Sequence, residues 1–448
     1  MIPIVNASFN LTQCCNLKCS YCFTKGKTNK TMSLDTAKKC VDFLIKQAVE
    51  AKYGELINHQ RAIDISFWGG EPLLEWDLLK KIVLYAEQVI PKGVGLKFGG
   101  TTNGTLLTPE KFNFLSQHKI FFMVSLDGTP ETHDRYRIRE NGKGSHKIVM
   151  KNVTQAIKRW PFYKVRISPY PERIGYFYED IKYLVDHKCY NIMFSPVYEH
   201  EWTEIHWQTW KEQCFKVVDM ITEYKKRGIK IDIEHFRSYC RSDNSKWPCG
   251  AGRFYIGFDC DGSIWPCHRF IKFIDQQPWQ EKEMCIGHVE LGITRPEIRQ
   301  QFIDFNPKCG DCEYSKNTPC HGGCFGINYD LVGKINTPYP GLCKYVEMQH
   351  KVSMYFKEKV GIEEREMNQR SCICYNMCYL EGTPDQIVDM DNSGISCHCN
   401  NTNYTGDLDT EKVARSVKNI QVNPYDILKR VEALEKKVKE LEFNKSGQ

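Results

Sequence analysis

The first half of the chain alternates between short apolar strands and amphipathic helices, and this order constrains the fold more than any other feature. Repeated strand–helix units indicate a parallel sheet with right-handed crossovers. Six repeats predict an α/β fold, a partial (β/α)6 barrel of the TIM type, with its functional site at the carboxyl ends of the strands. The expected strands cover 4–11, 62–68, 96–102, 120–126, 163–169 and 190–197, and the helices between them 33–52, 76–90, 108–117, 147–160 and 175–187.

Three cysteines lie within eight residues directly after the first expected strand. Cys15, Cys19 and Cys22 follow the spacing CxxxCxxC, and Cys14 lies outside it. Iron–sulfur clusters are normally held by four thiolates, so three on one short loop leave one iron without a protein ligand. A zinc loop or a set of buried thiols is the alternative, but zinc sites favour two-residue spacings and a closed tetrahedral set. We therefore predict a cluster with one iron open to a small molecule.

With Tyr21 before the last cysteine and Phe23 after it, this motif resembles that of the radical S-adenosylmethionine (SAM) enzymes. The resemblance implies a [4Fe-4S] cluster on the three cysteines, with its fourth iron chelated by the amino and carboxylate groups of SAM. It also implies reductive cleavage of SAM to methionine and a 5′-deoxyadenosyl radical that abstracts hydrogen from a substrate carbon.

Gly69, Gly70 and Glu71 follow the second strand. The two glycines let main chain approach a ligand, and the carboxylate can accept a hydrogen bond from an ammonium group. In isolation the segment could be a turn with an exposed Glu. On the strand after a CxxxCxxC loop, it matches the radical SAM segment that binds the SAM amino group.

Polar residues also end the next strands. Segments 101–104 and 125–128 could be polar turns, yet both match family positions at the SAM pocket, which implies ribose or carboxylate contacts from Asn103 and Ser125. Arg137 resembles a family position that pairs with the SAM carboxylate, with a surface ion pair as the alternative. Arg166, at the end of the fifth strand, is a further candidate of the same kind.

A second cysteine array lies beyond the barrel. It resembles the SPASM domain, the seven-cysteine module that holds two auxiliary [4Fe-4S] clusters in radical SAM enzymes that modify peptides and proteins. Two structural zinc ribbons are the alternative. Seven residues separate Cys312 from Cys320, where the family usually has five. A loop absorbs this insertion of two residues at small cost. The array consists of Cys249, Cys267, Cys309, Cys312, Cys320, Cys324 and Cys343.

The resemblance implies an outer cluster on Cys309, Cys312, Cys320 and Cys343, and an inner cluster on Cys249, Cys267 and Cys324. The inner cluster is then one ligand short. Cys260 could supply it, but segment 259–262 is typical of a hairpin turn between strands 254–258 and 263–265, and its tip can point away. Two interpretations stay open: Cys260 is a ligand, or an open iron binds a substrate thiolate.

Segments 255–258 and 264–270 further resemble maturases of ribosomally made, cysteine-containing peptides, the sactipeptide and ranthipeptide enzymes. The expected function is therefore an oxidoreductase that links a Cys sulfur to a carbon of the same precursor peptide. The expected partners are that peptide and a reductant such as flavodoxin or ferredoxin. No catalytic acid or base is assigned.

Three alternatives remain. An anaerobic sulfatase-maturating enzyme, which makes formylglycine, would be favoured by a fully ligated inner cluster and an acidic residue near the substrate carbon. Epimerisation or C–C crosslinking of a peptide is the second. A non-enzymatic electron-transfer or peptide-binding protein is the third, and the barrel with its segment 69–71 argues against it.

Length and composition bound the rest. A chain of 448 residues is too long for one core, and we expect a barrel over 1–235, a SPASM domain over 236–365 and a tail over 366–448. A net charge of +6, spread thinly, argues against nucleic-acid binding. No apolar run could span a membrane and no export signal begins the chain, so a cytoplasmic protein is expected. There, 22 cysteines favour metal clusters over disulfides.

The tail has two features. Its cysteine-rich stretch could hold another metal, fold over the active site, mimic a substrate or be a linker; the cysteines are Cys372, Cys374, Cys378, Cys397 and Cys399. Apolar residues then follow a 4-3-4-3 spacing that predicts a coiled-coil helix. That stripe would pair with a second copy to form a homodimer, pair with a peptide partner, or pack on the protein's own body; it comprises Ile427, Val431, Leu434, Val438 and Leu441.

Overall fold

The computed structural model describes residues 2–51, 62–159, 163–239, 249–275, 277–318 and 320–361. All of them belong to the first of two compact units, which covers residues 1–384. The five cysteines of the tail and the coiled-coil stripe lie outside the described residues and stay predictions, as do the three domain ranges.

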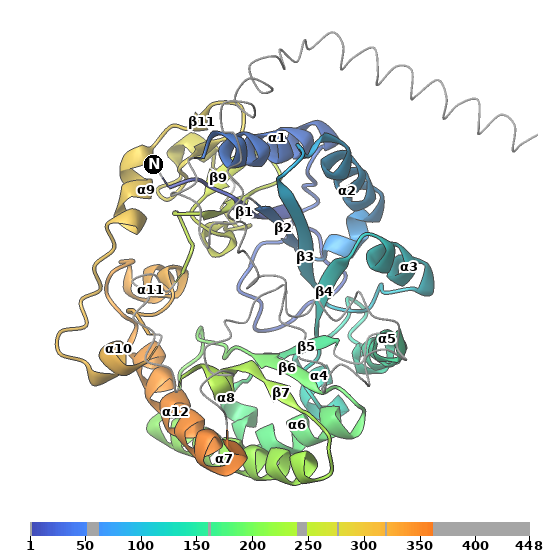
Figure 1. Cartoon of the computed structure of the whole chain (residues 1–448), viewed down its shortest axis with the longest axis vertical. Coiled ribbons are helices and arrows are strands. Elements are labelled where there is room, and N and C mark those ends of the chain that lie inside the picture. The colour runs from blue at the N-terminus through green and yellow to red at the C-terminus, as the bar shows by residue number, and fades with distance from the viewer. Residues whose placement is uncertain are drawn as a thin grey trace, which may run out of the picture. The chain divides into compact units, whose positions relative to one another are not determined.

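Parallel strands pair in chain order to form an open arc, and helices cover its outer side (Figure 1). This arrangement confirms the predicted α/β fold with a partial barrel. The fifth and sixth strands are shorter than expected, and a short seventh strand follows. The strands are β1 (Asn6–Thr12), β2 (Ala62–Gly69), β3 (Gly95–Thr102), β4 (Ile120–Ser125), β5 (Lys164–Ile167), β6 (Asn191–Phe194) and β7 (Asp232–Ile233).

The crossover helices begin where the sequence offers capping side chains. Ser33, predicted as an N-cap, accepts a hydrogen bond from the main-chain N of Thr36, and Thr108 accepts one from Lys111. The expected helix over 175–187 begins instead with a 3₁₀ turn, η4 (Pro171–Tyr176). The helices are α1 (Leu34–Glu50), α2 (Trp76–Val89), α3 (Pro109–Gln117), α5 (His146–Arg159), α6 (Phe177–Asp186) and α7 (Glu204–Lys226).

Side chains alternate along the strands between a buried aromatic face of the sheet and a polar face that lines the interior of the arc. The rings of Phe9, Phe67 and Phe122 are completely buried, with centroids of neighbouring rings 6.4 to 6.5 Å apart. Because successive side chains on a strand point to opposite faces, the residues between them, such as Ser8 and Ser66, lie on the other face. The aromatic layer anchors the sheet to its helices, and the polar face lines the interior.

The hairpin expected over 254–265 is present, but it joins the barrel sheet. β8 (Tyr255–Phe258) pairs in parallel with β1, and the sheet continues antiparallel through β9 (Ser263–Trp265), β10 (Gly287–His288) and β11 (Gly292–Ile293). This pairing was not predicted, because it joins segments about 250 positions apart. It attaches the second cysteine array to the strand that leads into the first.

Shorter helices complete the described structure. Those near or beyond the barrel's end are α8 (Glu234–Ser238), α9 (Pro296–Ile303), α10 (Glu313–Asn317), α11 (Phe325–Val332) and α12 (Pro340–Phe356). Helices α7 and α12 lie side by side (Figure 1), and the rings of Trp210 and Tyr345 join them with centroids 5.6 Å apart. No helix in the described ranges is long and apolar enough to cross a membrane.

Candidate functional site

The loop over residues 13–24, which we call the first cysteine loop, is held on two sides by main-chain hydrogen bonds. On one side, the N–H of Glu71 donates to the carbonyl of Cys14 at 2.9 Å. On the other, the N–H of Lys18 donates to the carbonyl of Ile138 at 2.8 Å. The loop is therefore fixed between the end of β2 and the segment after α4 (Pro130–Tyr136), a helix that the sequence analysis did not predict.

The thiols of Cys15, Cys19 and Cys22 lie close enough for their charges to interact, and all three are free. The ammonium of Lys27 interacts with all of them, and its Nζ donates to the carbonyl of Leu17 at 2.9 Å. Burial raises the pKa of Cys15, and that of Cys19 to about 11, so metal binding here would release protons. Three free thiols beside a cation fit a cluster ligated by thiolates. Nothing in the sequence singled out Lys27.

Among the residues that the structure describes, no group of three or more His, Cys, Asp or Glu side chains lies close enough together to hold a single metal ion.

Gly69 and Gly70 are required by the first cysteine loop itself. Gly69 has φ of +144°, and a Cβ there would lie 2.3 Å from the carbonyl oxygen of Thr12. A Cβ on Gly70 would lie 2.0 Å from the carbonyl oxygen of Cys14. From the sequence, we expected the main chain to approach a ligand at these glycines. The close approach in the structure is that of the cysteine loop, and a contact of these glycines with SAM stays a prediction.

Glu71 is buried, and its carboxylate joins the main chain just after it to residues 102–103 at the end of β3. Oε1 accepts from the N–H of Leu73 at 3.1 Å and from Oγ1 of Thr102 at 2.7 Å, and Oε2 accepts from the N–H of Asn103 at 2.7 Å. Burial raises the pKa of this carboxyl, although these hydrogen bonds oppose the effect. Glu71 therefore fixes the end of β3. A carboxylate has about four acceptor positions, so a bond to an ammonium group, as predicted, is compatible with these contacts.

Asn103 and Ser125 end neighbouring strands. The Nδ2 of Asn103 donates to Oδ1 of Asn16 at 2.7 Å and lies 3.9 Å from the Sγ of Cys15. Ser125 is the last residue of β4 and is paired in register with Arg166 on β5. The structure thus brings Asn103 to the first cysteine loop and places Ser125 one strand further along the same edge.

Arg137 has a buried carboxylate partner that the sequence analysis did not predict. Its Nε donates to Oδ2 of Asp127 at 2.6 Å and its Nη2 to Oδ1 at 3.2 Å, while the hydroxyl of Tyr21 donates to Oδ2 at 2.5 Å. Burial alone would raise the pKa of Asp127, but the Arg137 guanidinium outweighs it and holds this pKa below its usual range. Arg137 is therefore no surface ion pair. Its contact with SAM stays a prediction.

Electrostatic interactions link thiols of the second cysteine array within two groups, and ligation of two clusters by these groups stays a prediction. The thiol of Cys267 interacts electrostatically with those of Cys324 and Cys249. Burial raises the pKa of Cys249 to about 11 and also raises that of Cys267. In the other group, Cys309 interacts with Cys312, Cys320 and Cys343, and burial raises its pKa to about 11.

Cys260 lies apart from the inner group. It is 7% exposed, and its Sγ donates to the carbonyl of Asn10 on β1 at 3.2 Å. The turn around it is held by Asp259, whose Oδ1 accepts from Nδ2 of Asn10 at 2.6 Å and from the N–H of Cys260 at 2.8 Å. The largest electrostatic effects on this thiol come from Asp259 and Asp261, and that of Lys30 is smaller.

His268 connects the two cysteine regions, and the sequence analysis gave it no role. It follows Cys267, and its ring centroid lies 5.2 Å from that of Trp68 and 6.4 Å from that of Phe23 in the first cysteine loop. Its Nδ1 lies 2.7 Å from the hydroxyl of Tyr255. Burial lowers the pKa of His268 to about 4, so the ring is neutral at pH 7. Its spatial neighbours come from distant segments, so no local pattern could have indicated it.

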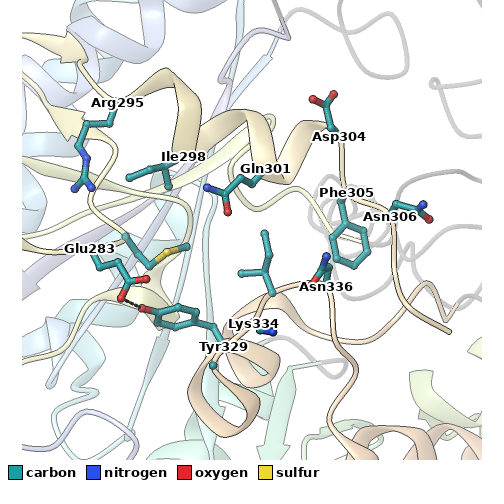
Figure 2. Close-up of a pocket in the computed structure, with 13 residues that line it drawn as sticks. Glu283, Arg295, Ile298, Gln301, Asp304, Phe305, Asn306, Tyr329, Lys334 and Asn336 are labelled. Carbon is teal, nitrogen blue, oxygen red and sulfur yellow. Dashed lines mark hydrogen bonds between the residues drawn. The ribbon is translucent and has the colours of Figure 1, made fainter.

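A separate cavity of about 480 Å³ lies between α9 and the end of α11 (Figure 2). Ile298 and Phe305 contribute apolar surface, and the hydroxyl of Tyr329 donates to Glu283 at 2.6 Å at its edge. None of the predicted site residues lines this cavity.

Known proteins match both the sequence and the fold. Residues 9–184 match the model of the Radical SAM superfamily. The cysteine-type anaerobic sulfatase-maturating enzyme of Clostridium novyi (strain NT) is 24% identical over 332 residues, which cover 69% of this chain and 84% of that protein.

Two solved structures share the fold. One is native anSMEcpe with bound AdoMet, with a TM-score of 0.63 and 17% identity over 80% of this chain and all of that one. The other is Streptococcus suis SuiB bound to its precursor peptide SuiA, with a TM-score of 0.51 and 16% identity over 77% of this chain and 76% of that one. The match to the family model, together with the CxxxCxxC loop at the barrel's edge, shows a Radical SAM domain over residues 9–184.

Proposed function

We propose that this protein is a radical SAM maturase that forms a thioether between a Cys sulfur and a carbon of the same ribosomally made precursor peptide. The observation that carries this proposal is the position of Cys260. Its thiol donates to the carbonyl of Asn10, whereas Cys249, Cys267 and Cys324 interact with one another. An inner cluster on these three cysteines would keep one iron free for a substrate thiolate.

The protein's own residues have defined tasks in this proposal. The first cysteine loop and the inner cysteines would hold two clusters, and His268 with Trp68 lies between these regions. Glu71 and Asn103 keep the first cysteine loop and the end of β3 in fixed relation. The interior of the arc would hold the substrate C–H bond in place and exclude water and other hydrogen donors.

The bound groups would supply the chemistry that side chains lack. When bound, SAM and the first cluster provide the hydrogen-atom acceptor, and the inner cluster provides an iron for the thiolate and an acceptor for one electron. Overall, one C–H and one S–H bond break and one C–S bond forms. The balance would be one hydrogen atom taken up by the acceptor that SAM supplies, one thiol proton released to solvent, and one electron for the inner cluster. A reductant such as flavodoxin or ferredoxin is expected to start each cycle.

Anaerobic reconstitution tests the proposal. Iron and sulfide are counted, and reductant, SAM and a Cys-containing peptide encoded beside the gene are then added. About twelve irons per chain, formation of 5′-deoxyadenosine and a peptide lighter by two hydrogen atoms per event are the expected results. Fragmentation then locates the link. A peptide of reduced mass without a sulfur–carbon crosslink would overturn the thioether assignment.

Formylglycine formation is the second candidate, and the similarity to anaerobic sulfatase-maturating enzymes favours it. One feature argues against it: the thiol of Cys260 donates to the carbonyl of Asn10, whereas the inner cysteines interact with one another. The same assay separates the candidates, because formylglycine made from cysteine has lost its sulfur, whereas a thioether retains it.

A further inference from the structure

Arg166 lies on the inner face of the sheet, at the edge where the candidate site is. It precedes the last residue of β5 and is paired in register with Ser125 on β4 and Met193 on β6. Its strand neighbours Val165 and Ile167 are buried in the core, so alternation places Arg166 on the opposite face. Its side chain is partly buried.

The position of Arg166 bridges the two halves of the site. On one side it interacts electrostatically with Tyr21 of the first cysteine loop and with Arg137 and Asp127 beside this loop. On the other side it acts on His268, which follows the inner cysteine Cys267. A group bound to Arg166 would therefore lie between the first cysteine loop and the inner cysteines.

The neighbouring cations already have carboxylate partners. Arg137 is paired with Asp127, and Arg269 is paired with Glu199 and lies 3.4 Å from Asp330. By contrast, the guanidinium of Arg166 has no hydrogen-bond or salt-bridge partner among the residues that the structure describes.

Asp127, an acid whose charge acts on Arg166, already has other partners and cannot serve as its counter-ion at low cost. Oδ1 of Asp127 accepts from the N–H of Ser168 at 2.8 Å in addition to Arg137, and Oδ2 accepts from Tyr21. Burial lowers the pKa of Arg166, and the charge of Arg137 adds to this effect. A partly buried guanidinium without a counter-charge is costly, and an incoming anion would remove that cost.

We propose that Arg166 binds a carboxylate of the peptide substrate, an Asp or Glu side chain or the C-terminus, and so selects acidic peptides. This rests on the proposed action on peptides. A guanidinium presents a planar fork that matches a carboxylate, which makes this group the fitting anion. SAM also has a carboxylate, but its expected place is at the first cysteine loop, whereas the charge of Arg166 also acts on His268.

Binding measurements test the proposal without requiring product formation. Two pools of short synthetic peptides each have one Cys at a fixed position, and a Glu is scanned through one pool and a Gln through the other. At saturating SAM, the reconstituted protein should bind the best Glu peptide about tenfold more tightly than its Gln counterpart, as charge-assisted hydrogen bonds require. Equal binding of every matched pair would overturn the proposal.

Variants identify the residue responsible. Arg166→Gln should lose the preference for Glu, whereas Arg166→Lys should keep part of it, since it retains the charge but not the fork. Affinity for SAM should not change in either variant. Weaker SAM binding with an unchanged Glu preference would assign Arg166 to the SAM carboxylate and refute the inference. Because binding alone is measured, failure of thioether formation would be seen separately, in the product assay.

Discussion

The guanidinium of Arg137 and the carboxylate of Asp127 form a two-point ion pair in which both side chains are buried, with Nε to Oδ2 at 2.6 Å and Nη2 to Oδ1 at 3.2 Å. Tyr21 of the first cysteine loop donates to the same carboxylate, and so does the N–H of Ser168 just after β5. The pair thus ties the loop to two strand ends. Its integrity should affect both the stability of the fold and the position of the cysteines.

Arg137→Gln should lower the free energy of unfolding by about 3–5 kcal/mol at pH 7, because it leaves the Asp127 charge buried without its partner. In the wild type the pKa of Asp127 is depressed. The pair's contribution is therefore full above the unfolded pKa of about 3.9 and is lost as pH falls through the lower folded value. In the variant, burial raises this pKa instead, so the loss of stability should be smaller at pH 5 than at pH 7.

Urea unfolding of the reconstituted protein at the two pH values measures this effect. The double variant Asp127→Asn with Arg137→Gln is the control, because it removes both charges and should recover part of the stability. An Arg137→Gln loss that is the same at both pH values, or a double variant no more stable than the single one, would contradict the charge-based explanation.

Gly70→Ala should displace the first cysteine loop. Its new Cβ would meet the carbonyl oxygen of Cys14 at 2.0 Å, a main-chain atom that cannot move alone. Such overpacking costs about 1–3 kcal/mol, and we expect up to about four irons per chain to be lost along with SAM cleavage. Gly175→Ala is the matched control, since its Cβ would meet only Thr209 Cγ2 at 4.0 Å. Full iron content in Gly70→Ala would show that the loop tolerates the shift.

Replacing any cysteine of the CxxxCxxC motif with Ala should abolish SAM cleavage, because the first cluster would lose a ligand. Cys14→Ala is the internal control. Its contact with Glu71 uses the main-chain carbonyl, which the substitution retains. Formation of 5′-deoxyadenosine under reducing conditions is the readout. If Cys15→Ala cleaved SAM as fast as Cys14→Ala, the central assignment would be wrong.

The sequence was sufficient for those parts of the fold that local patterns determine. Strand–helix alternation predicted the parallel arc, and Ser33 marked a helix start through its capping side chain. Helix α4 was missed because its seven residues are too few and too polar for a helical period. The pairing of β8 with β1 was missed because no local signal selects a partner about 250 positions away.

The same distinction between local patterns and distant contacts holds for the residues of the site. Spacing grouped the cysteines into sets, and thiols within these sets interact electrostatically in the structure, while their role as cluster ligands stays a prediction. Which partner each side chain chooses was not predictable. Arg137 was expected to pair with the SAM carboxylate, yet its guanidinium is hydrogen-bonded to the carboxylate of Asp127. Lys27 and His268 join the site through tertiary contacts alone. Such choices depend on distances between strand ends, which periodicity does not encode.

Cys260→Ala should leave the iron content unchanged, because this thiol donates to the Asn10 carbonyl and the inner cysteines lie elsewhere. Cys267→Ala, in which a member of the inner group is removed, should lose about four irons per chain. Iron and sulfide analysis after anaerobic reconstitution compares the two variants directly. Equal losses would make Cys260 a ligand, close the inner cluster and remove the main argument for thiolate binding, which would favour formylglycine chemistry instead.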